Sequence, residues 1–486
     1  MQHPTNSKIG LFDAVLLVSG SMIGSGIFLV TSEMTLLLGN VWYILFAWVL
    51  AGVITLLAAL NFGELASMMP NAGGQFNFVT RIYGKRMGFV YGWSVFTVIQ
   101  TGVIAAVAMA FSTHFWLLID YVTILFNSGK GYVYESHLHP IGKPLLAIGS
   151  VALLTYINSR GIQESKKVQR FFTLAKIIAL AALIVGGLYI GFGGSLNGAQ
   201  NFWSSNTNNG FQAQQWSSIS SGISDSSSSS SWVDISGSVL ILAFAAAMVG
   251  SLFSSDAWQG ITFMSHEIDK PEKTIPKALL WGTLLVTIIY CLANVAYFTL
   301  LPWKEIAMVS EGRVGVAAMG KLLGGVFLPQ VIMAILIMIS TFGCNNGLIL
   351  AGSRLYQAMA EKGLFFQKAA VLNSRNIPSN ALWMQAFWAS VLCLSGSYGQ
   401  LLSYCTFASL LFYIITVAGV LKLRLKEPNA DRPYKVWLYP VSTIAYLVLA
   451  GFVAIGILIS QFDIAIKGIA IVALGWPIYY LFKRDK

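Results

Sequence analysis

The chain has 486 residues, of which 56% are hydrophobic and 10% charged, and its formal net charge is +11. Soluble domains carry about 25% charged residues, so this composition excludes a soluble globular protein. Twelve apolar runs are candidates for membrane spans, which take about 20 residues each. The runs lie at roughly 11–36, 41–66, 88–126, 144–158, 168–192, 234–264, 277–301, 324–356, 379–396, 399–424, 437–460 and 464–482.

The first run contains a polar, glycine-rich gap from Gly20 to Phe28, GSMIGSGIF. Each glycine costs a helix about 1 kcal/mol relative to alanine, and unwound backbone at membrane depth is tolerated only inside protein or along a cavity. The gap therefore favours a broken helix, which is typical of transporter binding sites. The spacing of Gly20 and Gly24 is also a helix-packing pattern, so this run alone leaves both interpretations open.

The sixth run is interrupted in a similar way from Met248 to Gly260, MVGSLFSSDAWQG. Interruptions in the first and sixth runs are what two five-helix repeats produce, because an odd number of spans turns the second copy upside down. Asp256 lies at the centre of the second interruption, just before an apolar half-helix. Capping of that half-helix is its expected role, and contact of its carboxylate with a substrate is the alternative.

Broken helices expose two kinds of backbone group. The second half of the first span begins near Gly24, and its first N–H groups have no intrahelical acceptor and carry partial positive charge, which suits an anion. The free carbonyl groups that end the first half-helices suit a cation. A solute with a carboxylate and an ammonium on one carbon matches both, so the residues predict a transporter of zwitterions, most naturally α-amino acids.

Lysines and arginines are distributed unequally between the two sets of loops. Of the 30, 23 fall on one side, six on the other, and Lys176 falls within a span. The positive-inside rule then places both termini in the cytoplasm. The same distribution explains the net charge without a nucleic-acid partner. All four cysteines lie in spans, where packing and not a disulfide framework is expected; they are Cys291, Cys344, Cys393 and Cys405.

Further motifs are FGEL at 62–65, MPNAGGQF at 69–76, FSSDAW at 253–258 and RPYK at 432–435. Together with the gap at 20–28 they resemble the amino acid–polyamine–organocation superfamily, in particular its L-type amino-acid transporter branch. The resemblance implies an all-α integral membrane protein with 12 transmembrane helices. The resemblance further implies that these helices form a LeuT-like 5+5 inverted repeat with broken helices 1 and 6, followed by two C-terminal helices. The expected parts are a cytoplasmic N-terminus (1–10), repeat 1 (11–192), a Ser-rich exterior loop (193–233), repeat 2 (234–426) and the last two helices (437–482).

The resemblance also implies roles for the residues at the two gaps. Backbone N–H groups there hold the substrate carboxylate, and carbonyl groups take its α-ammonium. The Phe253 ring closes over the substrate, and Trp258 shapes the side-chain pocket. The N–H donors are Gly24, Ser25 and Gly26, and the carbonyl acceptors are Met22, Phe253 and Asp256.

Lys176 is a second charged residue within a span. From its position alone, snorkelling towards the cytoplasmic interface is favoured. The resemblance implies instead that its ammonium stands where sodium sits in related transporters, with Ser340, Thr341 and Cys344 as neighbours. A buried lysine can also bind and release a proton, so a structural role and a coupling role both stay open.

The function indicated is sodium-independent transport of neutral L-amino acids by alternating access, with exchange as the first expectation. Proton-coupled symport, or a permease for another amine or amino-acid-like solute, is the alternative. An enzyme is not expected, since zinc, dinucleotide and Gly-x-Ser-x-Gly motifs are missing, and neither a cofactor nor a metal is expected. A channel would need filter residues from repeated subunits. The resemblance implies that animal L-type transporters link to a glycoprotein through a cysteine between spans three and four. Residues 127–143, which form that loop here, contain no cysteine. A disulfide-linked subunit is therefore not expected, and a bacterial cytoplasmic (inner) membrane is favoured.

Overall fold

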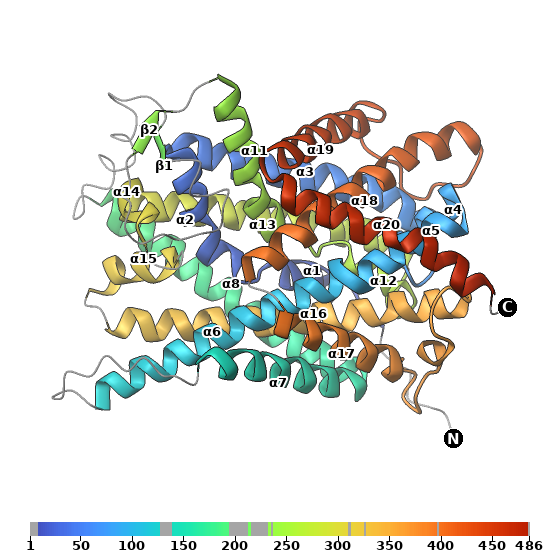
Figure 1. Ribbon diagram of the computed structural model, residues 1–486, viewed down its shortest axis with the longest axis horizontal. Helices are drawn as coiled ribbons and strands as arrows, with labels where there is room; N and C mark the ends of the chain where they lie inside the picture. Colours follow the sequence, from blue (N-terminus) through green and yellow to red (C-terminus); the bar gives the residue numbers. More distant parts are fainter. Residues whose placement is uncertain are drawn as a thin grey trace.

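The computed structural model describes residues 8–126, 139–193, 212–214, 232–234, 237–309, 313–324, 327–395 and 398–484. Long helices lie side by side along one direction of the molecule (Figure 1). The described part departs from the expected all-α fold only in a short ribbon, in which β1 (Gln212–Gln214) pairs antiparallel with β2 (Trp232–Asp234). The rest of the serine-rich loop expected at 193–233 lies almost entirely outside the described residues.

Nine helical segments in the described part are long and apolar enough to cross a membrane, so the chain is a multi-pass membrane protein. One is formed jointly by α5 (Lys85–Ser94), the π-helical turn η1 (Val95–Ile99) and α6 (Gln100–Phe126). The others are α3 (Val41–Met68), α7 (His139–Ser159), α8 (Ile162–Phe192), α11 (Gly237–Ser254), α13 (Pro271–Leu300), α16 (Phe327–Glu361), α18 (Tyr398–Lys426) and α19 (Val441–Ser460).

A further candidate span is the broken pair α1 (Leu11–Met22) and α2 (Gly26–Leu38). Two further helices, α17 (Ser379–Ser395) and α20 (Phe462–Arg484), lie where the sequence predicts spans nine and twelve. The count of twelve and the inverted repeat stay predictions. The connecting helices are α4 (Gln75–Tyr83), α12 (Gly260–Phe263), η2 (Ser265–Glu267), α14 (Trp303–Ala307), α15 (Val314–Leu323) and η4 (Gln367–Ala370).

The exposed faces of the spanning helices are apolar, while some of their polar side chains point inwards. On α8, Ile178, Val185 and Tyr189 are 67%, 68% and 80% exposed, whereas Lys176 on the same helix is 1% exposed. Contiguous apolar surface of this kind is rare on soluble monomers and suits contact with lipid. The interior therefore contains the polar groups that function requires.

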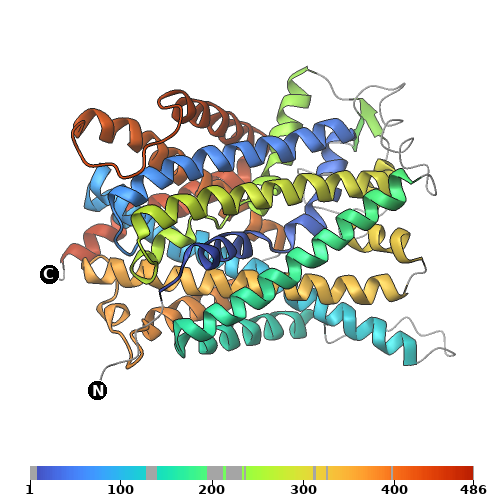
Figure 2. The same ribbon diagram turned by 180° about the vertical axis from the view of Figure 1, so that it is seen from behind.

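The broken first span lies inside a frame of long helices. Helix α13 packs along α3, and α16 packs along α6. Helix α8 contacts α1, α13 and α16, and Figure 2 shows α3, α13 and α8 as neighbours across one side of the bundle. A buried hydrogen bond of 2.6 Å from Thr31 Oγ1 on α2 to Asn294 Oδ1 on α13 adds a polar contact to this packing. The frame fixes the two halves of the first span independently.

Both marked chain ends lie at one end of the bundle, and the β-ribbon with α14 and α15 lies at the other (Figure 1). We call the first the basic end, because many arginines and lysines lie there. Its ion pairs involve Asp13 with Lys166 and Arg170, Glu64 with Arg424 and Arg432, Arg81 with Glu427, and Arg354 with Glu267.

Candidate functional site: two adjoining helix breaks

Both interruptions predicted from the sequence are present, and they adjoin each other. Helix α1 ends at Met22 and α2 begins at Gly26, with a bend of 41° between them; we call this break 1. Helix α11 ends at Ser254 and α12 begins at Gly260, which defines break 2. A Cβ atom on Gly26 would lie 2.1 Å from Ser254 Oγ. The missing side chain of Gly26 therefore allows the two breaks to approach closely.

The hydroxyl group of Tyr290, on α13, bridges the two breaks. Its oxygen lies 3.1 Å from the carbonyl oxygen of Met22 and 3.0 Å from that of Ser254, and its ring is 1% exposed. A hydroxyl has one proton to donate, so the two carbonyl groups share it. The ends of the two first half-helices are thereby held together. The sequence analysis missed Tyr290, because a single tyrosine in an apolar run gives no signal beyond packing.

Lys176, on α8, fastens break 1 to the surrounding frame. Its Nζ donates to the carbonyl oxygens of Gly20 and Ile23 at 2.5 and 2.6 Å, and lies 3.4 Å from the carbonyl oxygen of Ser340 on α16. The side chain thus does not snorkel to an interface, and that expectation from position alone is wrong. Free carbonyl groups at the end of α1 offer the ammonium better acceptors than a distant interface does.

The neighbours expected for Lys176 on α16 behave differently from one another. Ser340 Oγ donates to the carbonyl oxygens of Gly24 and Ile23, at 2.8 and 3.2 Å. Cys344 Sγ lies 2.9 Å from the carbonyl oxygen of Ser21. Thr341 instead hydrogen-bonds within its own helix, to Ile337 and Met338. Ser340 and Cys344 therefore support the unwound backbone of break 1, whereas Thr341 supports α16 itself.

Asp256 does not cap the half-helix that follows it. Helix α12 begins four residues later, and its N-cap position is Gln259, which makes no side-chain cap. The Asp256 carboxylate instead accepts a hydrogen bond from the Tyr413 hydroxyl on α18. The capping role predicted from the sequence is wrong, because the unwound segment extends from Ser255 to Gln259 and moves the helix start away from the carboxylate.

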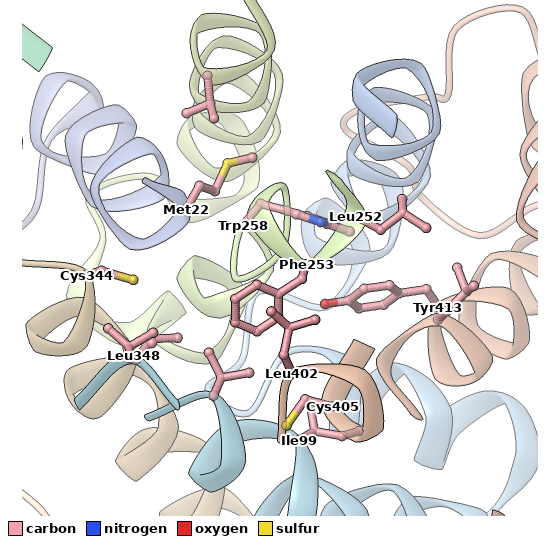
Figure 3. Packing of buried hydrophobic residues seen from close by; sticks show 14 of the residues in the cluster. Met22, Ile99, Leu252, Phe253, Trp258, Cys344, Leu348, Leu402, Cys405 and Tyr413 are labelled. Carbon is pink, nitrogen blue, oxygen red and sulfur yellow. The ribbon is translucent and has the colours of Figure 1, made fainter. Parts of the chain in front are cut away.

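The residues expected to contact a substrate are buried and closely grouped. Phe253 is 8% exposed. Figure 3 shows its ring between Leu348 of α16 and Tyr413 of α18, with Met22 at the nearby end of α1. The Trp258 ring packs against Phe62 and Tyr413, with centroid distances of 4.8 and 5.2 Å. The grouped side chains close the breaks off from solvent in this structure.

The backbone expected to bind an anion is also enclosed. Ser25 is 1% exposed, and the backbone N–H of Phe28 bonds to its carbonyl oxygen at 3.0 Å, which forms the first turn of α2. A Cβ atom on Gly24 would lie 3.4 Å from Cys344 Sγ. The first N–H groups of a helix have no intrahelical acceptors, so this segment can bind a carboxylate. The described residues contain no group of three or more side chains suited to hold a metal ion.

A family model described as amino acid permease matches residues 9–480. The chain belongs to this family. The Asc-type amino acid transporter 1 of Mus musculus is 30% identical over 99% of this chain and 82% of its own length. The large neutral amino acids transporter small subunit 2 of Mus musculus is 31% identical over 98% and 80%. The serine/threonine exchanger SteT of Bacillus subtilis (strain 168) is 28% identical over 99% and 97%.

These matches confirm the resemblance to the superfamily and to its L-type branch. They also agree with the fold, since the matched region extends from two residues before α1 into α20. Amino-acid transport across a membrane is thus the family activity of this chain, and the relatives named are transporters and not enzymes.

Proposed function

We propose that this permease exchanges neutral L-amino acids across the membrane by alternating access and without sodium. The observation that carries the proposal is the contact of Lys176 with the carbonyl oxygens of Gly20 and Ile23. The ammonium is fixed to the scaffold, and it supplies positive charge at break 1 that another carrier would take from a bound cation. The names of the relatives support neutral amino acids as substrates and exchange as the mode.

The substrate α-carboxylate binds to the backbone N–H groups of Gly24, Ser25 and Gly26, where the positive end of the α2 dipole favours an anion. The α-ammonium binds to the carbonyl groups of Met22, Phe253 and Asp256, and the Phe253 ring closes over the substrate. Trp258 shapes the pocket for the substrate side chain. The proximity of the two breaks supports this arrangement, since one small zwitterion can then contact both.

The test is uptake of labelled neutral L-amino acids into sodium-free proteoliposomes, with and without the same amino acid inside, at two pH values. Strong stimulation by internal substrate with little pH dependence is the expected result. Uptake that needs a proton gradient and no internal substrate would replace exchange with proton-coupled symport. Uptake only in the presence of sodium would overturn the role given to Lys176. Uptake of amines and not of amino acids would point to another solute.

The proposal places the basic end in the cytoplasm, following the positive-inside rule, and favours a bacterial cytoplasmic membrane. It includes no nucleic-acid partner and no disulfide-linked subunit. The resemblance to the L-type branch implies that a linking cysteine would lie between spans three and four. That segment, 127–143, contains no cysteine, and most of it lies outside the described residues. Among the residues that the structure describes, the four cysteines are free.

A further inference from the structure

A small cavity adjoins Asp256 between α3, α11, α18 and α19, which are not the helices that hold Lys176. Hydroxyl groups line much of it, from Thr55, Ser255, Thr406, Ser409, Tyr413 and Tyr446. The Tyr446 side chain is fully buried, and its hydroxyl has no hydrogen-bond partner. A buried hydroxyl without a hydrogen-bond partner costs free energy. The cavity therefore favours a hydrogen-bond donor that Tyr446 can accept from, such as a protonated Asp256.

The cavity contains an acid but no base to pair with it. Among the described residues that line it there is no lysine, arginine or histidine. The titratable groups that face Asp256 are a thiol and three phenols, which cannot supply a positive charge: Cys405 and Tyr413 on α18, Tyr446 on α19, and Tyr91 on α5, while α3 contributes none to the cavity lining. Asp256 itself is 9% exposed. The Tyr413 and Ser409 hydroxyls and the backbone N–H of Ala257 face the carboxyl group, but none of these donors carries a charge. A buried, ionised carboxylate without a counter-charge is costly even when it accepts hydrogen bonds.

A metal ion is poorly suited to balance the negative charge of an ionised Asp256 carboxylate in this cavity. Hard cations need several oxygen ligands, commonly with more than one carboxylate, and the cavity offers the carboxylate of Asp256 alone. A proton needs only one oxygen lone pair. The Tyr413 hydroxyl donates to Oδ1 of Asp256, which leaves Oδ2 to bind a proton.

We propose that Asp256 is a proton-binding site of this carrier, occupied by one proton while break 2 is closed as in this structure. The proton binds to Oδ2, and the resulting O–H donates into the cavity, where the Ser409 and Tyr446 hydroxyl oxygens are acceptors. Ser409 lies one helical turn before Tyr413 and faces the same carboxyl group. When break 2 opens to water, hydration removes the cost of ionisation, and the proton passes from Oδ2 to water.

The proposed site goes beyond the exchange activity and does not depend on it. It is separate from Lys176, which contacts the end of α1 from α8, whereas Asp256 lies within break 2 and pairs with Tyr413 of α18. An obligate exchanger that always carries a substrate would keep the proton through the cycle. A half-cycle in which break 2 opens without substrate would release it, and would link transport to pH.

Infrared spectroscopy of the full-length protein in lipid tests the assignment without any transport measurement. A protonated carboxyl group has a carbonyl stretch separate from the bands of ionised carboxylates, and labelling with ¹³C-aspartate shifts it. We expect such an aspartic-acid band at neutral pH in the unmodified protein and its loss in Asp256→Asn. The matched control is Asp13→Asn, because Asp13 is ion-paired with Lys166 and Arg170 and should contribute no such band.

Absence of the band at neutral pH, or its survival in Asp256→Asn, would overturn the proposal. If Asp256→Asn does not fold, Tyr413→Phe serves instead, since losing the hydrogen bond to Oδ1 should shift the band, and an unshifted band would contradict the assignment. The readout needs no substrate gradient. A failure of exchange in proteoliposomes would therefore leave this result standing, and a missing band would leave exchange standing.

Discussion

Lys176 and Tyr290 share one task, which is to donate hydrogen bonds to main-chain carbonyl groups where helices stop. Lys176 serves the end of α1 at Gly20 and Ile23, and Tyr290 serves Met22 and Ser254. A buried carbonyl group without a donor costs about 1–3 kcal/mol. The breaks are therefore stable because side chains from α8 and α13 replace the missing helical N–H groups.

We expect Lys176→Ala to lower the initial uptake rate about tenfold or more, because two buried carbonyl groups lose their donor and each loss of about 1.4 kcal/mol is a factor of ten. The measurement is uptake by equal amounts of reconstituted protein. Lys167→Ala is the control on the same helix, since the Lys167 side chain is 73% exposed and its pair with Glu164 is a surface contact of little value. Wild-type rates in Lys176→Ala would refute the assigned role.

We expect Tyr290→Phe to raise the KM for substrate about fivefold, because one hydrogen bond of about 1 kcal/mol no longer organises the carbonyl groups that receive the α-ammonium. Concentration-dependent uptake measures this change. Tyr297→Phe is the matched control: it removes a buried hydroxyl two turns along α13 that has no hydrogen-bond partner. Equal KM changes in both variants would show that the bridge is not the cause.

At the residue scale, the sequence predicted the breaks, Lys176 and, by resemblance, Ser340 and Cys344 near it, but not the hydrogen bonds that each side chain makes. Glycine and serine in an apolar run give a local signal, and so does a charge within a span. The rotation of α16 decides that Ser340 and not Thr341 faces break 1, and this rotation depends on packing with α6 and α8. Tyr290 and Tyr413 gave no signal, because their partners are distant in sequence.

At the scale of helices, the two breaks work as one unit because Gly26 contacts α11 without a side chain. We expect Gly26→Ala to abolish uptake, since its Cβ would lie 2.1 Å from Ser254 Oγ and 2.9 Å from Ser254 Cβ, and overpacking costs about 1–3 kcal/mol. The backbone N–H of residue 26 is retained, so the variant tests close approach and not anion binding. Uptake and the thermal midpoint are the readouts.

The control is Gly149→Ala in α7, where a Cβ would meet nothing within 4 Å. Alanine in a helix interior is favoured over glycine by about 1 kcal/mol, so this variant should keep uptake and its thermal midpoint. Normal uptake in Gly26→Ala would mean that the two breaks separate enough to admit a methyl group, and that their contact is not required.

Glu64 joins three helices at the basic end. It lies near the end of α3, is 1% exposed, and accepts from Arg424 Nε of α18 at 2.9 Å and from the backbone N–H of Val436, before α19, at 2.8 Å. We expect Glu64→Gln to lower the free energy of unfolding by about 3–5 kcal/mol, because Arg432, whose side chain is 6% exposed, and the partly buried Arg424 lose their counter-charge. Thermal unfolding in detergent measures the loss.

Glu427→Gln is the control for charge removal in the same region. Glu427 pairs with Arg81 where both side chains are about one-third exposed, and such surface pairs contribute about 0–1 kcal/mol. A thermal midpoint in Glu64→Gln equal to that of Glu427→Gln would show that the cluster does not hold α3, α18 and α19 together.

At the scale of whole elements, the sequence predicted helix positions well and helix ends poorly. The twelve apolar runs each contain a helix or a broken pair, because membrane-length apolar runs have few other stable forms. Break 2, from Ser255 to Gln259, is shorter than the interruption expected from the sequence, but α12 begins four residues after Asp256 and not directly after it. Ala257, within the break, has a positive φ of 71°, which is not helical. The residues on either side of Ala257 contact distant helices, Asp256 with Tyr413 of α18 and Trp258 with Phe62 of α3, and no local pattern encodes these contacts.

For the molecule as a whole, the asymmetry of charge predicts orientation. Most of the ion-paired arginines and lysines of the described part lie at the basic end, which carries both marked chain ends (Figure 1), and cytoplasmic loops carry excess lysine and arginine. We expect a fluorescent protein fused after the last residue to fluoresce in bacterial cells, and an alkaline phosphatase fused there to be inactive. Active phosphatase would show that the basic end lies outside the cytoplasm and would reverse the proposed orientation.

The fixed ammonium of Lys176 has a consequence for the environment in which such a carrier can operate. A covalently attached group has an effective concentration set by its tether and not by the surrounding solution. A dissolved ion in the same position would be diluted away in a salt-poor medium and would need a maintained gradient to return. With the proposed role of Lys176, the positive charge at break 1 belongs to the polypeptide itself, and its presence does not depend on the sodium concentration of the medium.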